Sequence, residues 1–167
     1  LWLLWRYKRQ LNIVAGEFKD DFKNGLFKWD YGGEGWKIEY ENNSPVLSVT
    51  DSQDGGISKR GFSWADYEFS FEAKVIKDAS GWIIRAENRS KFFMIQLNMQ
   101  NPKEPRLRPH FRLNDSKYPW IALEGNAVNL NDLNLKNPIT LNEWFKVKMI
   151  VRGTEIDIYL NEQHVFH

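Results

Sequence analysis

A run of alternating basic side chains is the feature of the sequence that most suggests chemistry. Arg106, Arg108, His110 and Arg112 occupy every second position and are separated by apolar residues. Such alternation predicts a strand whose basic side chains all point away from the core. Guanidinium groups donate paired hydrogen bonds to carboxylates and to other closely spaced oxygen atoms. The run therefore predicts a surface that could recognise a carboxylate or the adjacent hydroxyls of a sugar.

Three preceding segments extend this surface if their strands are neighbours in one sheet. Tyr67–Val75, Trp82–Ala86 and Phe92–Asn98 each alternate between apolar residues and more polar ones. Their outward polar residues are Glu68, Ser70, Glu72, Arg85, Gln96 and Asn98. Amide, carboxylate and guanidinium groups on one face would suit polyol recognition, with Met94 covering the C–H face of a sugar.

Trp120 follows the basic strand in a predicted loop, Tyr118–Trp120. It could stack on a sugar ring or another flat ligand, or it could pack beneath its own loop. The polar face has an alternative as well, because charged residues of an exposed sheet can pair across strands without any ligand. On the binding interpretation, the ligand-binding residues are Glu72, Arg85, Gln96, Asn98, Arg108, His110, Arg112 and Trp120.

Short strands separated by turns are expected to position these side chains. Further strands are predicted over Trp36–Tyr40, Val46–Val49 and Ile57–Gly61, and Phe145–Arg152 and Glu155–Leu160 form a hairpin. No stretch shows a sustained helical period. The segment Leu123–Leu141 is predicted as a long loop or a short helix. The pattern favours an all-β fold, an antiparallel two-sheet sandwich of the jelly-roll type.

Composition excludes several classes of function. The chain has 167 residues, of which 42% are hydrophobic and 27% charged, with a formal net charge of +1. So balanced a charge argues against a dedicated nucleic-acid binder. The absence of cysteine excludes disulfides, thiolate metal sites and cysteine nucleophiles.

No metal or other cofactor is required by any motif, although a calcium ion could bind acidic turns. Asp20, Asp21, Asp51 and Asp54 offer oxygen ligands, but none lies in a D-x-D-x-D-G loop. Solvated turn carboxylates are the alternative explanation. The three histidines are scattered along the chain and do not form a metal-ligating pattern.

Residues 1–17 are predicted as a separate N-terminal segment before a domain at 18–167. Leu1–Trp5 is apolar and aromatic, and basic residues follow in Arg6–Arg9. This pattern is typical of the interfacial end of a transmembrane helix. An amphipathic tail or a strand packed on the domain is the alternative. The expected location is extracellular or at the cell surface, with possible anchoring in a membrane whose side the sequence leaves open.

The strand motifs resemble those of concanavalin A-like domains, the laminin-G or jelly-roll group. The chain is most similar in style to bacterial 3-keto-disaccharide hydrolase-like and family 16-like modules. The resemblance spans about residues 20–163 and rests on the segments Asp20–Phe22, Gly35–Ile38, Trp64–Phe69, Gly81–Arg85, Glu143–Val147 and Gly153–Asn161. It implies a curved sandwich with Arg85 on its concave sheet. The family often has Gly after the Asn of the last hairpin, whereas here Glu162 follows Asn161.

Three functions remain open after these observations. The first hypothesis is a non-catalytic, lectin-like carbohydrate-binding module. The second is a structural or protein-interaction subunit tethered at a membrane, with another protein as its partner. The third is a glycoside-processing enzyme, since Glu155–Ile158 resembles the E-h-D-h segment of family 16. Tyr159 and Leu160 stand where that family has its second catalytic Glu, so a chance match is the preferred interpretation.

Overall fold

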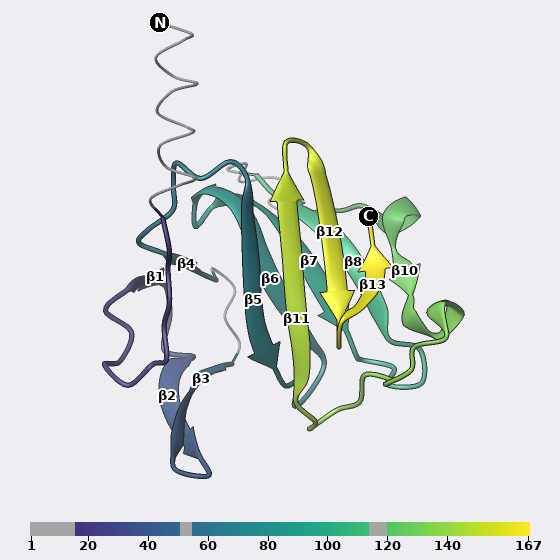
Figure 1. Cartoon of the computed structure of the whole chain (residues 1–167), viewed down its shortest axis with the longest axis horizontal. Helices are drawn as coiled ribbons and strands as arrows, with labels where there is room; N and C mark the ends of the chain where they lie inside the picture. Colours follow the sequence, from purple (N-terminus) through teal and green to yellow (C-terminus); the bar gives the residue numbers. More distant parts are fainter. Residues whose placement is uncertain (1–15, 51–54, 114–119) are drawn as a thin grey trace, which may run out of the picture.

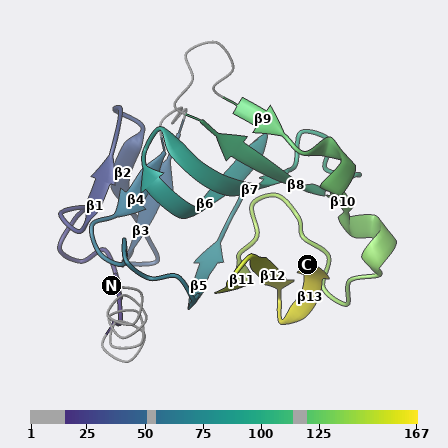
Figure 2. The same cartoon turned by 90° about the horizontal axis from the view of Figure 1, so that it is seen from above.

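Two antiparallel sheets pack face to face in the computed structural model, which describes residues 16–50, 55–113 and 120–167 (Figures 1 and 2). The front sheet of Figure 1 has the strand order β13-β12-β11-β5. Its strands are β5 (Tyr67–Ala73), β11 (Phe145–Arg152), β12 (Glu155–Leu160) and β13 (Gln163–Phe166). Each pairs antiparallel with its neighbour, so the prediction of an all-β antiparallel sandwich is confirmed.

The back sheet has the order β10-β8-β7-β6, and β9 pairs with β8 as well. Its strands are β6 (Ala79–Asn88), β7 (Lys91–Asn98), β8 (Arg106–Arg112), β9 (Trp120–Ala122) and β10 (Val128–Asn129). Because β6, β7 and β8 follow one another along the chain, they pair as a simple antiparallel meander. The sheet therefore brings the outward residues of β7 and β8 side by side.

Two small antiparallel ladders lie beside the sandwich (Figure 1). They are β1 (Trp29–Tyr31) with β4 (Gly56–Ser58), and β2 (Trp36–Glu41) with β3 (Ser44–Val49). The β2 hairpin is held to the sandwich through Glu41. Its carboxylate lies 2.6 Å from Lys74 Nζ and accepts a 3.3 Å hydrogen bond from Trp144 Nε1.

The core lies between the two sheets and is filled by the inward residues of their strands. Ile95 and Leu97 of the back sheet and Met149 and Ile158 of the front sheet are fully buried. Trp82 of β6 adds an aromatic contact across the layers. Alternation along each strand produces this arrangement, because every second side chain enters the core.

The sequence-based strand boundaries agree closely with the observed ones in several places. β11 and β12 have the predicted bounds. β7 begins one residue before the predicted Phe92–Asn98, and β8 ends one residue before the end of the predicted Arg106–Leu113. The segment Leu123–Leu141, which was predicted as a long loop or a short helix, contains two 3₁₀ helices. They are η1 (Glu124–Asn126) and η2 (Leu130–Leu133), and β10 lies between them. Leu130 and Ile139 from this segment are buried in the core, so it closes one side of the sandwich.

The predicted membrane-proximal segment lies mostly outside the described residues, which begin at residue 16. Within the described ranges, the structure has no helix of the length and apolar character that a membrane crossing requires. Asp51 and Asp54, named above as candidate calcium ligands, also lie outside these ranges.

The last strand, β13, is tied to β12 by two histidines that share one carboxylate. Asp157 Oδ1 lies 2.9 Å from His164 Nε2 and 2.9 Å from His167 Nδ1. Hydrogen bonds from His167 and then His164 lower the pKa of Asp157 from its ordinary 3.8. Because the His167 ring donates this hydrogen bond to the Asp157 carboxylate, the pKa of His167 is raised above its ordinary 6.5.

These shifts predict that β13 is held most firmly at mildly acidic pH. The His167 contribution is fully present below pH 6.5 and is lost as pH rises through its elevated pKa. The Asp157 contribution is present above pH 3.8 and is lost as pH falls through its lowered pKa. We expect NMR titration to give an elevated His167 pKa that returns to the ordinary value in Asp157→Asn. An unchanged His167 pKa in that variant would contradict the assignment.

Candidate functional site

The outward side chains of β7 and β8 form one face of the back sheet, which is polar where Gln96, Asn98, Arg106 and Arg108 lie. The strand register pairs Gln96 with Arg108 and Asn98 with Arg106. Gln96 Oε1 accepts a 3.2 Å hydrogen bond from Arg108 Nη1. The structure therefore brings together three of the predicted site residues, Gln96, Asn98 and Arg108. We call this surface, with η1 and Trp120 at its margins, the β7–β8 face.

Arg108 makes hydrogen bonds with two neighbouring side chains of this face, Gln96 and Glu124. Its Nε donates a 3.3 Å hydrogen bond to Glu124 Oε2, and its Nη2 donates to Glu124 Oε1. This fork-to-fork contact fixes both planar groups in one orientation. The hydrogen bond from Arg108 is the main reason that the pKa of the Glu124 carboxyl is lowered. Glu124 thus remains an anionic acceptor beside the guanidinium.

Sequence reasoning missed Glu124. The residue begins η1, in a segment where neither a two-residue nor a helical period can be recognised. No alternation could therefore assign it to a face. Glu124 is placed against Arg108 because β9 before it and β10 after it both pair with β8.

Asn98 and Arg106 lie at one end of the face. The amide of Asn98 interacts with Gln100, whose backbone N–H donates a 3.1 Å hydrogen bond to Asn98 Oδ1. Arg106 Nη2 lies 3.7 Å from Glu104 Oε2. Both side chains belong to the exposed margin of the sheet, where a ligand could displace weak contacts.

Trp120 and Arg112 lie at the other end of the face. The Arg112 guanidinium is 5.1 Å from the Trp120 ring centroid, a cation–π arrangement. The indole and the Phe92 ring meet in a T-shaped contact, with ring centroids 5.7 Å apart. Trp120 is still 40% exposed. Trp120 was predicted either to stack on a ligand or to pack beneath its own loop. In the structure it packs on the sheet and also leaves aromatic surface exposed to solvent.

His110 does not form part of the open surface, which corrects one prediction. The residue is only 8% exposed, and its ring makes a T-shaped contact with Trp120 at a centroid distance of 6.5 Å. Its Nδ1 lies 2.9 Å from the Arg108 carbonyl oxygen. Alternation placed His110 on the correct face, but β9 pairs with β8 and brings Trp120 over it.

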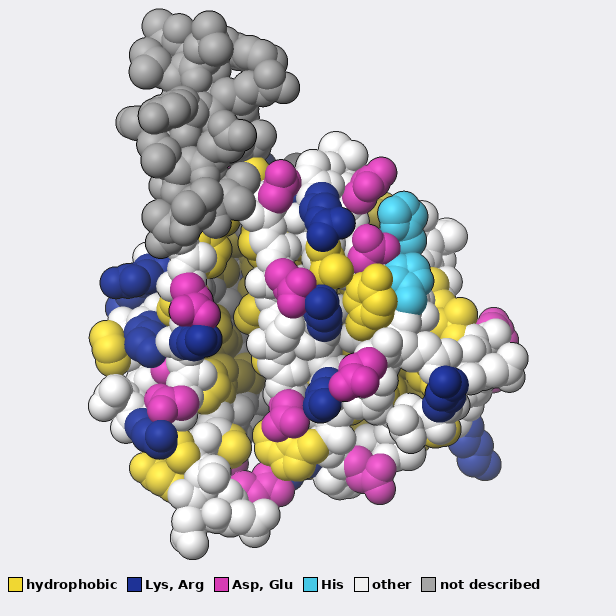
Figure 3. Space-filling view, viewed as in Figure 1, with side chains coloured by type: hydrophobic (Ala, Val, Ile, Leu, Met, Phe, Trp, Pro, Cys, Tyr) yellow, Lys and Arg dark blue, Asp and Glu magenta, His cyan; other side chains and the backbone are white. Residues whose placement is uncertain are grey.

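Glu72 lies in the other sheet, which corrects a second prediction. The strand β5 pairs with β11 and has no pairing with β6. Glu72, together with Glu68 and Ser70, therefore faces outward from the front sheet, on the face that Figure 3 shows. The assumption that β5 is a neighbour of β6 was wrong, because alternation assigns faces but not partners.

Arg85 is also separate from the β7–β8 face. Its backbone has φ = 53°, and the pairing of β6 with β7 shifts register beyond Ile84. Its Nη2 donates to the Gly153 carbonyl at the turn between β11 and β12, and its backbone N–H donates to the Tyr67 hydroxyl at 3.2 Å. Arg85 thus bridges the edges of the two sheets and does not join Gln96 and Arg108 on the β7–β8 face.

The acidic groups form no metal site in the part of the chain that the structure describes, where no cluster of three or more His, Asp or Glu side chains is arranged to hold an ion. Asp20 instead accepts hydrogen bonds from Phe22 N–H and Trp29 Nε1. Asp21 pairs with Lys23 at 3.0 Å. These two carboxylates therefore form hydrogen bonds and an ion pair within the N-terminal turns.

The architecture places the chain in the class of antiparallel two-sheet β-sandwich proteins. Among solved structures, the carbohydrate-binding module CBM66 from Bacillus subtilis is similar, with a TM-score of 0.56. The match covers 84% of this chain and 78% of that chain at 11% sequence identity, and it supports the sandwich fold. No protein-family model matches the sequence, and a search of curated proteins gave no match.

Proposed function

We propose that the chain is a non-catalytic carbohydrate-binding module that holds its ligand on the β7–β8 face. The single observation that carries the proposal is the hydrogen-bonded array Gln96–Arg108–Glu124. A planar amide, a guanidinium and a carboxylate are fixed in a row before any ligand arrives. The fold likeness to a carbohydrate-binding module supports the same class of ligand.

The array suits the hydroxyl pairs of a sugar. A hydroxyl can donate to Glu124 while it accepts from the amide of Gln96 or from Arg108, so each sugar oxygen finds both kinds of partner. Met94 lies between these groups and Trp120 on the outer side of β7, where it can contact C–H groups. Arg108 and Arg112 are four residues apart, about 13 Å along the strand. The face therefore suits an extended oligosaccharide better than a single ring.

The charge of the face is compatible with neutral or acidic sugars. Arg106 lies near Glu104, and Arg108 pairs with Glu124. A uronic acid would also suit the face, because its carboxylate forms charge-assisted hydrogen bonds with guanidinium groups.

Replacing Arg108 by Ala is expected to weaken oligosaccharide binding at least tenfold. Hydrogen bonds to charged groups contribute about 1.5–3 kcal/mol each, and the variant also releases Glu124 and Gln96 from their fixed positions. Isothermal titration against a panel of neutral and uronic-acid oligosaccharides measures the loss. Arg60→Ala, which removes an exposed guanidinium outside the face, is the matched control and should bind normally. Equal affinities of both variants would refute the proposed site.

We also propose an extracellular or cell-surface location, which suits a module that meets polysaccharides. The apolar Leu1–Trp5 and the basic Arg6–Arg9 support attachment near a membrane. Labelling of intact cells with a reagent that cannot cross membranes should modify lysines of the domain. Protection of those lysines until the cells are lysed would contradict this location.

A further inference from the structure

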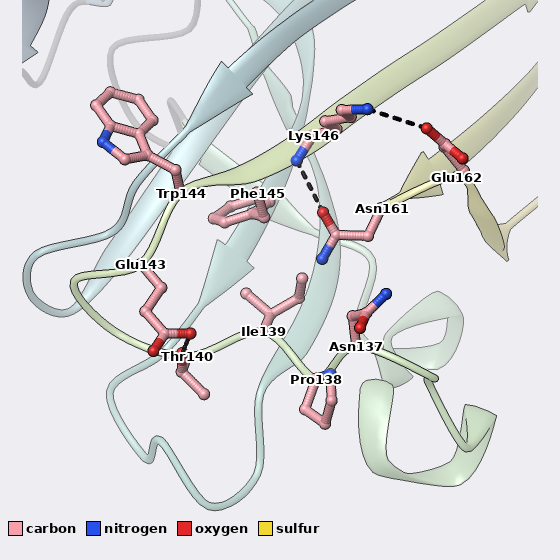
Figure 4. A pocket seen from close by; sticks show the side chains of 10 residues that line it. All are labelled: Asn137, Pro138, Ile139, Thr140, Glu143, Trp144, Phe145, Lys146, Asn161 and Glu162. Atoms are coloured by element: carbon pink, nitrogen blue, oxygen red, sulfur yellow. Dashed lines mark hydrogen bonds and ion pairs between the residues drawn. The ribbon is translucent and has the colours of Figure 1, made fainter.

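The front sheet carries a hollow that the β7–β8 face does not explain. It has a volume of about 380 Å³ and is formed by the segment before β11, the start of β11 and the β12–β13 turn (Figure 4). Asn137 and Asn161 point their amide groups into the same space from two different elements. Ile139 and Phe145, each 4% exposed, form its floor. The volume lies at the lower end of the range for small-molecule sites.

Carboxylates lie on both sides of this hollow. Glu143 is held by a 2.6 Å hydrogen bond from the Thr140 hydroxyl, and Glu162 lies 3.0 Å from Lys146 Nζ. Each bond engages one oxygen of its carboxylate and leaves the other oxygen available to a ligand. Within the described residues the side chain of Asn137 has no hydrogen-bond partner, so its amide can serve a ligand.

The turn that carries Asn161 and Glu162 has an unusual backbone. Both residues have positive φ angles, 46° and 70°. Asn tolerates this region, but Glu does not favour it and Gly is the usual choice in such two-residue turns. Asn161 is fixed further, because its Oδ1 accepts a 3.0 Å hydrogen bond from the Lys146 N–H. The strained backbone keeps the Glu162 carboxylate beside the hollow, where glycine would offer no side chain.

A second hollow continues from the first across the outer face of β5, β11 and β12. Its volume is about 620 Å³, and it shares Lys146 and Glu162 with the first. Glu72 and Lys148 contribute polar groups to it, and Tyr159 contributes an aromatic ring. Figure 3 shows acidic and basic side chains interspersed over this sheet. The Lys146–Glu162 ion pair therefore stands between two adjoining hollows.

We infer that these two adjoining hollows form a second saccharide site, on the opposite sheet from the β7–β8 face, that takes neutral sugars. Amide donors and carboxylate acceptors converge over an apolar floor, an arrangement that satisfies hydroxyls which donate and accept at once. The charge selects against acidic sugars, because Glu72, Glu143 and Glu162 outnumber Lys146 and Lys148. The inference extends the proposed function to a second surface, and either site can fail without the other.

Nitrogen-15 NMR of the 167-residue chain tests the inference through side-chain amide signals. The probes are D-glucose, D-mannose, D-galactose, D-fructose and D-glucuronate. We expect at least one neutral sugar to shift the amide signals of Asn137 and Asn161, with D-glucuronate shifting them at least fivefold less. Asn137→Ala and Glu162→Gly should each weaken that binding at least fivefold. Gly tolerates the positive φ of position 162, so this variant should stay folded. Asn24→Ala, which removes an exposed amide from an N-terminal turn, is the matched control.

The two sites give different signals, so their failures are distinguishable. If only the Gln96 and Asn98 amides move, the second site is wrong and the proposed function stands. If Asn137 and Asn161 move with a monosaccharide while Gln96 and Asn98 do not move with any sugar of the oligosaccharide panel, the β7–β8 face is wrong and the second site stands. Absence of any shift at Asn137 with all five sugars, or an equal shift with D-glucuronate, would overturn the inference.

Discussion

Replacing Trp82 by Ala is expected to lower the free energy of unfolding by about 3–5 kcal/mol, the range for large aromatic side chains removed from a core. Trp82 is 6% exposed, and its ring lies 5.6 Å from Phe71 and 6.3 Å from Phe145 between centroids. Since Trp82 belongs to the back sheet and both phenylalanines to the front sheet, the variant removes an aromatic contact between the two layers. Chemical denaturation followed by fluorescence and circular dichroism measures the change.

A double-mutant cycle separates this inter-sheet contact from simple loss of volume. Combining Trp82→Ala with Phe145→Ala should destabilise less than the sum of the single variants, because residues in contact couple by about 0.5–3 kcal/mol. Ile76→Ala is the control; Ile76 is 62% exposed, and an exposed truncation changes stability by roughly 0.5 kcal/mol or less. Strict additivity of the Trp82 and Phe145 effects would show that the two rings do not meet across the core.

Alternation of side chains was enough to predict the fold class and the outer face of β7 and β8. Gln96 and Arg108 meet because their strands are consecutive and pair as a hairpin, the commonest connection between antiparallel strands. The same rule failed for Glu72, because β5 pairs with β11, which lies far along the chain. Periodicity within a strand contains no information about a distant partner, so the sheet that holds β5 could not be derived from the sequence.

Local irregularities account for the remaining errors in the predicted site. Arg85 is separated from the β7–β8 face because its backbone is left-handed, the pairing with β7 shifts register beyond Ile84, and its guanidinium reaches Gly153. His110 is on the predicted face but is buried there, since the three-residue strand β9 brings Trp120 above it. Glu124 lies in a 3₁₀ turn with no period to recognise. Each case depends on a single residue's backbone angle or on a short strand, features that a pattern of polar and apolar residues does not encode.

The strain at Glu162 could have been noticed from the sequence, unlike these irregularities. The family resemblance suggested Gly after Asn161, and the chain has Glu there. The structure gives this departure a physical meaning, because Glu162 keeps a positive φ and pairs with Lys146. Strained residues of this kind tend to occur at functional positions, where the surrounding structure maintains them. A departure from a turn's preferred residue is therefore a useful signal for a site.

Replacing Trp120 by Ala is expected to lower the free energy of unfolding by about 2–3 kcal/mol, less than a fully buried tryptophan because the residue is 40% exposed. The variant uncovers Phe92, which is 3% exposed, and His110. It also removes the aromatic partner of Arg112, so oligosaccharide affinity at the β7–β8 face should fall at least fivefold. Denaturant titration and calorimetric titration measure the two effects separately.

Trp144→Ala is the matched control for this variant, since Trp144 is 45% exposed but lies beside the front-sheet hollow. It should also be less stable than wild type, because it breaks the hydrogen bond to Glu41 and the contact with Lys74, whose Nζ is 4.9 Å from the indole centroid. Its binding at the β7–β8 face should be unchanged. If Trp120→Ala binds as tightly as Trp144→Ala, Trp120 has only a packing role, and recognition at this face rests on the Arg108 array alone.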